Sequence, residues 1–194
     1  MSWNGNEHNN LFRNEGTGDN GLPQFADVAM AMGADNVKDA RGMAVADFDN
    51  DGDLDIAIAT NPGDCGKETV SPVVLRNDIG QKRNYLVMEL KGTDSNRDAI
   101  GALVRVEATG SEDQEPLRLT RHVHCGSGYV SQNDLRLFFG LGNRERISKV
   151  VVRWPSGTEQ TFTSGIEANS LVRIVEGQEL PEQKIVDVAS SGQK

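Results

Sequence analysis

The chain has 194 residues, room for one ordinary domain or two small ones, and its 20 Lys and Arg against 29 Asp and Glu give a formal charge of −9. An acidic chain without a basic block is a poor partner for nucleic acid, and no apolar run approaches the ~18 residues of a transmembrane segment. The 21 glycines and the short Val-rich runs are typical of a protein with many turns and strands.

The acidic excess lies in the first third of the chain. Residues 1–64 hold 12 acidic and 3 basic side chains, whereas residues 65–194 hold 17 of each. Five carboxylates fall within nine residues, from Asp47 to Asp55. Like charges at that density repel one another unless water or a cation compensates them. This segment is therefore the first candidate for a site.

The first forty residues are polar and rich in Asn and Gly, with short apolar patches at 11–14 and 25–28. The string Leu-Phe-Arg-Asn at 11–14 is similar to Val-Leu-Arg-Asn at 74–77, about 63 residues later. A repeat of this length is typical of one supersecondary unit in an array, such as a propeller blade. Four residues of similarity also arise by chance, so the repeat stays one of two interpretations.

Strands are predicted on both sides of the acidic segment. Residues 42–46 lead into it, and residues 54–60 follow with apolar side chains at alternate positions, the period of a β-strand. Asn-Pro-Gly-Asp at 61–64 predicts a turn, after which residues 73–77 resume a strand.

From residue 84 the chain consists of short β-rich runs broken by Gly- and Pro-containing turns. Seven such runs with turns every 8–15 residues predict a β-sandwich or barrel. The runs are residues 85–90, 102–108, 117–123, 135–139, 150–154, 160–163 and 171–175. The expected class is all-β, with a change in sequence pattern near residue 84 that separates two parts.

The acidic segment has the spacing of a calcium loop. Its carboxylates occupy positions 1, 3, 5, 7 and 9, and Gly52 at position 6 permits a sharp turn. Ca²⁺ takes six to eight oxygen ligands at ~2.3–2.6 Å, which carboxylates at alternate positions of a tight loop can supply. Position 7 of such loops commonly donates its backbone carbonyl, so we expect Asp53 to bind through its main chain and to direct its side chain into water.

The acidic segment has two other interpretations. An EF-hand needs a bidentate Glu at position 12 between two helices, but position 12 is Ile58, within a predicted strand. A solvated acidic turn that binds nothing is disfavoured because no Lys or Arg lies among the five carboxylates. A calcium loop between two strands is the prediction.

Two resemblances cover most of residues 9–177. Residues 46–59 resemble the calcium loop of FG-GAP/VCBS repeats, as in integrin α propellers, and residues 10–16 and 25–28 are similar to other strands of such repeats. Residues 84–177 resemble the ASPIC/UnbV domain of the cartilage acidic protein 1 family. The stretches that carry the second resemblance are residues 95–102, 126–136, 139–142 and 152–157.

The resemblance implies a partial β-propeller with a calcium loop at 1–80, a β-sandwich-like module at 81–177 and a polar C-terminal tail at 178–194. It also implies an exported protein with Ca²⁺ in the propeller loops. It implies ligation through the side chains of Asp47, Asp49, Asp51 and Asp55 and the carbonyl of Asp53. A propeller closes with about four to eight blades, and this chain has room for one or two. The chain is then a fragment, or the blade packs directly on the second module, or strand edges pair between copies into a homo-oligomer or filament.

The two cysteines, Cys65 and Cys125, are 60 residues apart and outside any zinc-binding spacing. They form either one disulfide or two free thiols. The first residues lack the basic and apolar regions of a signal peptide. The expected location is extracellular or at the cell surface, as a mature form or fragment, with a cytoplasmic protein as the alternative.

Two further groups have polar side chains suited to ligands. His122, His124 and Cys125 present transition-metal ligands, although an edge strand with polar faces explains the same alternation. A second candidate is a carbohydrate-binding loop, against the alternative of a structural turn. Its residues are Ser127, Tyr129, Gln132 and Asn133. Ser127 lies outside a GxSxG motif, so a hydrolase nucleophile is not expected.

The predicted function is a calcium-binding extracellular or cell-surface interaction or structural module with a protein or glycan partner. No catalytic residue is assigned. The alternative is a polysaccharide-binding or polysaccharide-processing enzyme component that uses the calcium site. That alternative needs a base or paired acids in a cleft, and none stands out in the sequence.

Overall fold

A computed structural model describes residues 7–61, 71–78, 83–110 and 115–184, and within these ranges the protein is all-β without a helix. This confirms the predicted all-β class. The strands are β1 (Phe12–Thr17), β2 (Pro23–Asp27), β3 (Ala40–Ala46), β4 (Asp55–Thr60), β5 (Val73–Leu75), β6 (Asn84–Lys91), β7 (Leu103–Thr109), β8 (Leu117–His122), β9 (Leu137–Gly142), β10 (Arg146–Arg153), β11 (Glu159–Phe162), β12 (Ser170–Val175) and β13 (Glu182–Lys184).

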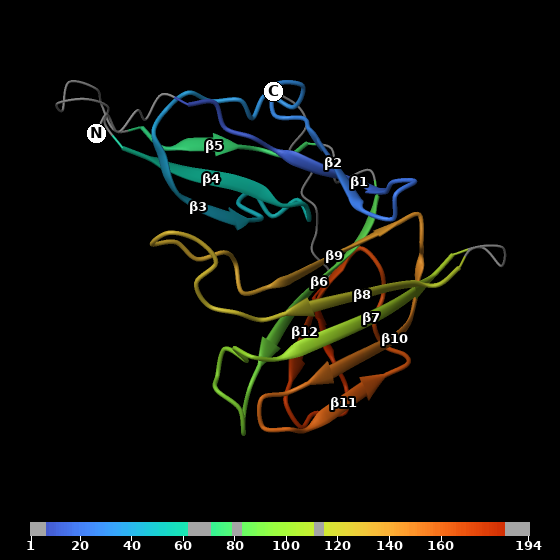
Figure 1. Ribbon diagram of the computed structural model, residues 1–194. Coiled ribbons are helices and arrows are strands. Elements are labelled where there is room, and N and C mark those ends of the chain that lie inside the picture. Colours follow the sequence, from blue (N-terminus) through green and yellow to red (C-terminus); the bar gives the residue numbers. More distant parts are fainter. Residues whose placement is uncertain (1–6, 62–70, 79–82, 111–114, 185–194) are drawn as a thin grey trace, which may run out of the picture.

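The described residues form four sheets, and none of these closes on itself. The first part of the chain gives the pair β1-β2 and the three-stranded sheet β3-β4-β5; the rest gives the sheets β11-β10-β7-β8 and β13-β12-β6-β9. In Figure 1 the first two sheets lie in the upper half of the molecule and the two larger sheets in the lower half. The seven strands predicted after residue 84 correspond to β6 through β12.

The hydrophobic core lies between the two four-stranded sheets. Strands alternate as the sequence pattern requires: Val104, Val106 and Ala108 of β7 are buried, and the residues between them are more exposed. Trp154 and Phe139 are the largest fully buried side chains of this core. Burying one Val, Leu, Ile, Phe or Met side chain contributes roughly 1.5–3 kcal/mol, so these sheets form the stable platform of the protein.

One pairing in this platform joins distant segments. β12 runs parallel to β6, with Ser170 opposite Leu86 and Val175 opposite Lys91. Residues 182–184, within the segment expected as a tail, pair with β12 as strand β13. The parallel pairing needs a crossover connection, which strand-by-strand sequence patterns do not reveal.

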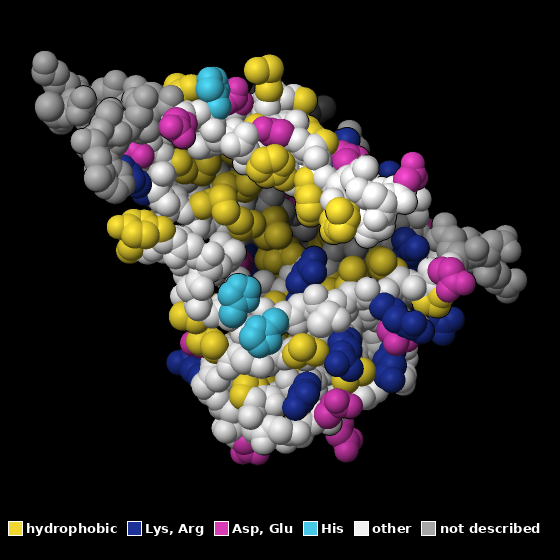
Figure 2. Space-filling view, in the orientation of Figure 1, with side chains coloured by type: hydrophobic (Ala, Val, Ile, Leu, Met, Phe, Trp, Pro, Cys, Tyr) yellow, Lys and Arg dark blue, Asp and Glu magenta, His cyan; other side chains and the backbone are white. Residues whose placement is uncertain are grey.

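The three-stranded sheet rests on the second part of the chain through the edge of β3. Val45 N donates to Asn133 Oδ1 at 3.0 Å, and Asp134 N donates to Val45 O at 3.0 Å. A hollow lined by Val45, Leu54 and Leu135, among others, lies beside this contact, and Figure 2 shows hydrophobic side chains in its floor. The β3-β4-β5 sheet therefore packs directly on the second part of the chain, which is one of the three arrangements expected.

Candidate metal centre

The acidic segment is the turn between β3 and β4. These strands pair antiparallel with Ala46 opposite Asp55, so the two ends of the segment meet. One carboxylate oxygen each from Asp47, Asp49 and Asp55 lies within 4.8 Å of the other two. Among the described residues this is the one group of His, Cys, Asp or Glu side chains gathered closely enough to hold a metal ion.

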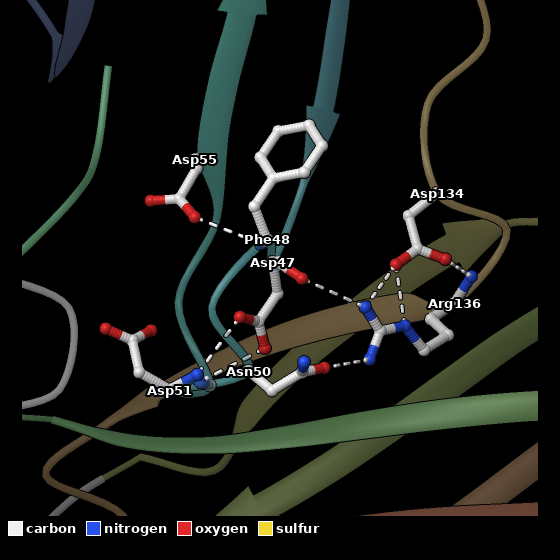
Figure 3. Close-up of polar contacts among 8 residues, drawn as sticks. Asp47, Phe48, Asn50, Asp51, Asp55, Asp134 and Arg136 are labelled. Carbon is white, nitrogen blue, oxygen red and sulfur yellow. Dashed lines mark hydrogen bonds and ion pairs between the residues drawn. The ribbon is translucent and has the colours of Figure 1, made fainter. Parts of the chain in front are cut away.

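Backbone amides hold two of these carboxylates in place. The two oxygens of Asp47 accept hydrogen bonds from Asp51 N and Gly52 N, both at 3.1 Å. The two oxygens of Asp55 accept from Phe48 N at 3.0 Å and Asn77 N at 2.8 Å. Figure 3 shows the Asp47 and Asp55 side chains on the same turn, with the hydrogen bond from Phe48 N to Asp55 and those from the turn's backbone amides to Asp47. The segment is thus ordered by its own hydrogen bonds.

The carboxylates of this turn are buried except at one position. Asp47, Asp51 and Asp53 are 6–7% exposed and Asp55 is 1% exposed, whereas Asp49 is exposed. The expectation that the Asp53 side chain points into water is therefore wrong. The turn is packed against the second part of the chain, and this contact could not be foreseen from the loop alone. Asp49 leaves one side of the group open to solvent.

The electrostatics of the turn favour a cation. Burial raises the pKa of Asp47 above its usual value, with a smaller contribution from Asp51, although two backbone hydrogen bonds and Arg136 act in the opposite direction. Burial also raises the pKa of Tyr85, and the charges of Asp47 and Asp51 raise it further. Both shifts show that negative charge is costly here without a compensating positive charge.

Sequence reasoning missed two neighbours of the turn. Arg136 donates to Asp47 O at 3.3 Å and to Asn50 Oδ1 at 3.5 Å (Figure 3). The ring of Tyr85 lies against Gly52, which has a φ of 94°. Arg136 falls within one of the ASPIC/UnbV-like stretches, but nothing in that stretch points to a partner 89 residues earlier.

The second candidate loop lies beside β3 and makes mostly local contacts. Ser127 Oγ accepts from Asn133 N at 3.3 Å, and Gln132 Oε1 accepts from the thiol of Cys125 at 3.4 Å. Tyr129 is 72% exposed, and a Cβ on Gly42 would lie 3.0 Å from its carbonyl oxygen. The loop thus holds β3, and Tyr129 points its ring outward.

The remaining candidates are the histidines and the cysteines. The rings of His122 and His124 stack with centroids 6.2 Å apart, and both residues are exposed, as is Cys125. Cys65 lies outside the described residues, so the disulfide hypothesis is not tested. None of the described residues forms a helix long and apolar enough to cross a membrane.

Fold and site together define an all-β protein with a carboxylate cluster able to hold a metal ion on a strand-to-strand turn. Residues 92–181 match the family model ASPIC and UnbV. The chain is 30% identical over 137 residues to cartilage acidic protein 1 of Xenopus tropicalis and of Homo sapiens, which is 69% of this chain and 19% of each relative. It is 29% identical over 150 residues to the Mus musculus protein, 76% of this chain and 21% of that relative. The chain therefore spans about a fifth of the length of these curated relatives.

Proposed function

We propose that residues 47–55 bind Ca²⁺ and that the chain is a calcium-stabilised interaction or structural module of the extracellular space or cell surface. The observation that carries the proposal is the convergence of the Asp47, Asp49 and Asp55 oxygens within 4.8 Å. The likeness of residues 46–59 to FG-GAP/VCBS calcium loops supports it, as does the similarity to cartilage acidic protein 1 for the location.

The donor set favours calcium over other ions. The group contains carboxylate oxygens and no His or Cys, which disfavours zinc and copper. Mg²⁺ demands near-ideal octahedral geometry at 2.0–2.1 Å, whereas Ca²⁺ accepts irregular sets of six to eight oxygens. Three carboxylates, the carbonyl of Asp53 and water entering beside Asp49 would supply such a set.

The proposed role of the ion is to tie the two parts of the chain together. Asp47 is a ligand candidate through its side chain, and its backbone carbonyl accepts the hydrogen bond from Arg136. Ordering Asp47 therefore also orders the contact between the β3-β4-β5 sheet and the second part. We retain residues 1–80 and 81–177 as the proposed units on either side of this contact.

The test is a calcium titration by calorimetry together with melting curves of the full chain in calcium and in chelator. At ~100-fold excess over Kd, an ion that binds only the folded state contributes ~2.7 kcal/mol, which raises the Tm by about 5–10 °C at this chain length. Identical melting curves in calcium and in chelator would contradict the proposal. Light scattering of the same samples tests self-association through strand edges.

Asp49→Asn is the variant of choice. Asp49 is exposed and makes no hydrogen bond or ion pair with any described residue, so its replacement leaves the turn folded. We expect the calcium shift to fall strongly. Asp19→Asn, an exposed carboxylate on the β1–β2 turn, is the matched control and keeps the full shift. Equal shifts in the two variants would place the ion elsewhere.

A further inference from the structure

A cationic face lies on the sheet β11-β10-β7-β8, on the side away from the core. In β7 the buried residues Val104 and Val106 alternate with Arg105 and Glu107, which lie on the opposite side of the sheet. Figure 2 shows Lys and Arg side chains gathered over β7, β8 and β10, with Asp and Glu side chains among them. We define the cationic face by Arg105, Arg118, Lys149 and Arg153.

The register places three of these arginines on a diagonal across adjacent strands. Arg118 of β8 is opposite Glu107 of β7, two residues after Arg105. Arg153 of β10 is opposite Leu103 of β7, two residues before Arg105. Diagonal neighbours in an antiparallel pair are about 7–8 Å apart, so the row presents a guanidinium group on each of three strands in succession.

Carboxylates on the same face compensate part of this positive charge. Glu107 lies directly opposite both Arg118 and Lys149, and Glu159 of β11 lies directly opposite Arg153. Arg118 forms a long ion pair with Glu107 at 3.6 Å, between exposed side chains. Arg105, Lys149 and Arg153 make no side-chain hydrogen bond or ion pair with any described residue. Cations exposed in a row repel one another, and an anionic partner relieves that repulsion. With four cations against these two carboxylates, the face keeps an excess of two positive charges, which favours an anionic partner.

From this arrangement we propose that the cationic face binds a sulfated polysaccharide chain. Guanidinium groups form bidentate, charge-assisted hydrogen bonds with planar or tetrahedral oxyanions. A row of such groups on a flat sheet contacts successive charges of a linear polymer. The acidic excess of the protein lies in residues 1–64. At 0.15 M salt, exposed charges are screened beyond about 8 Å, so the local charge of the face, and not the net charge of the protein, determines whether a polyanion binds there.

The composition of the face favours a polysaccharide over a protein or a nucleic acid. Among the described residues, its strands direct no Phe, Tyr or Trp outward: Trp154 and Phe162 at their ends are buried. Protein interfaces rely on aromatic anchors, and single-stranded nucleic acids stack their bases on aromatic rings. Reading the grooves of duplex DNA needs a protruding helix or ribbon, and this surface is a sheet face.

The experiment measures binding of the full chain to heparin oligosaccharides at 0.15 M salt, in chelator and in calcium. We expect binding in both conditions, because the cationic face does not use the acidic turn. The triple variant Arg105→Gln, Lys149→Gln, Arg153→Gln should lose about tenfold or more in affinity, and the slope of log affinity against log salt should fall by about one per lost contact.

The control variant is Lys38→Gln, Lys91→Gln, Arg97→Gln, which changes the net charge equally at exposed cations outside the face. We expect its heparin affinity to stay within about twofold of that of the parent chain.

Several results would overturn the proposal: no heparin binding by the parent chain, equal losses in both triple variants, or binding abolished by chelator. Duplex DNA or non-sulfated hyaluronan bound as tightly as heparin would overturn the assignment to sulfated chains. Failure of the calcium titration alone leaves this proposal standing.

Discussion

The guanidinium of Arg136 donates a hydrogen bond to the backbone carbonyl oxygen of Asp47 at 3.3 Å, although 89 residues separate the two in sequence. The same guanidinium forms an ion pair with Asp134 at 2.6 Å. Asp134 N in turn donates to Val45 O, one residue before the end of β3. The first residue of the acidic turn is therefore fixed by the second part of the chain, and order in one part depends on order in the other.

Arg136→Lys tests this coupling. Lysine keeps the positive charge but loses the planar fork that reaches Asp134, Asn50 and Asp47 together. We expect a loss of about 1–2 kcal/mol in the free energy of unfolding. In hydrogen exchange measured by mass spectrometry, peptides covering β3 and β4 should exchange faster, whereas peptides covering β7 and β10 keep their protection.

The matched control is Arg97→Gln, at an exposed arginine without a side-chain partner among the described residues. It should change neither stability nor exchange. If Arg136→Lys left the exchange of β3 and β4 unchanged, the hydrogen bond to Asp47 would contribute nothing to holding the two parts together.

Asp55→Asn separates the structural role of the turn from ion binding. Both oxygens of Asp55 accept backbone hydrogen bonds, and the residue is 1% exposed. An amide at this position presents a donor to one of two N–H groups. We expect a destabilisation of about 1–3 kcal/mol in chelator, measured by urea unfolding. Asp49→Asn, which breaks no described hydrogen bond, should be silent in chelator; equal losses in the two variants would contradict this division of roles.

The sequence predicts those features that depend on a single strand or a single turn. The alternation of apolar residues located β6 through β12, and the spacing of the carboxylates located the turn that gathers Asp47, Asp49 and Asp55. The spacing also predicted a ligand in the side chain of Asp51, which does not belong to that group. Contacts between distant segments could not be predicted, because periodicity carries no information on which elements meet. The parallel pairing of β12 with β6 and the contact of Arg136 with Asp47 are both of this kind.

The burial of Asp53 and Glu176 has the same origin. In sequence both are acidic residues in or next to turns, where exposure is the ordinary expectation. Glu176, at the end of β12, is 5% exposed because it joins two other loops. Its Oε2 accepts from Thr93 N, Asp94 N and Ser95 N at 2.7–3.0 Å. Its Oε1 accepts from the hydroxyls of Ser95 and Ser156 at 2.9 and 2.6 Å.

Glu176→Gln should lower the free energy of unfolding at pH 7 by about 2 kcal/mol, because an amide replaces one of two accepting oxygens and the charge is lost. Urea unfolding in chelator measures this change without interference from the acidic turn. Glu179→Gln, three residues later at an exposed position, is the control and should be neutral. Equal stability of the two variants would mean that the hydrogen bonds to Glu176 contribute nothing net.

The effect of Glu176→Gln should depend on pH in a defined direction. Burial alone would raise the pKa of Glu176, but the hydrogen bonds from Ser156, Ser95 and Thr93 outweigh it and lower the pKa from 4.5 to about 2. The folded state therefore binds this proton less tightly than the unfolded state. The stabilisation is complete above pH ~4.5 and is lost as the pH falls toward 2, so the gap between parent and variant should close over that range. A gap that stays constant from pH 7 to 2.5 would contradict the lowered pKa.

Gly52→Ala should disrupt the acidic turn through two separable effects. The φ of 94° at Gly52 is one that L-residues rarely adopt, and a Cβ there would lie against the ring of Tyr85, with the hydroxyl oxygen at 2.7 Å. Gly126→Ala isolates the first effect, because Gly126 has a φ of 76° and nothing within 4 Å of an added Cβ. We expect Gly126→Ala to cost about 1–2 kcal/mol and Gly52→Ala distinctly more, with weaker calcium binding.

The double variant Gly52→Ala, Tyr85→Ala identifies the cause of the additional loss. Removing the ring makes room for the new Cβ, so the destabilisation of the double variant should be smaller than the sum of the two single changes by about 0.5–3 kcal/mol, measured by urea unfolding. Additive losses would mean that the turn does not press on Tyr85. Tyr85 is the second residue of β6, in the second part of the chain. A positive coupling therefore also shows that the acidic turn of the first part is held against that strand in solution.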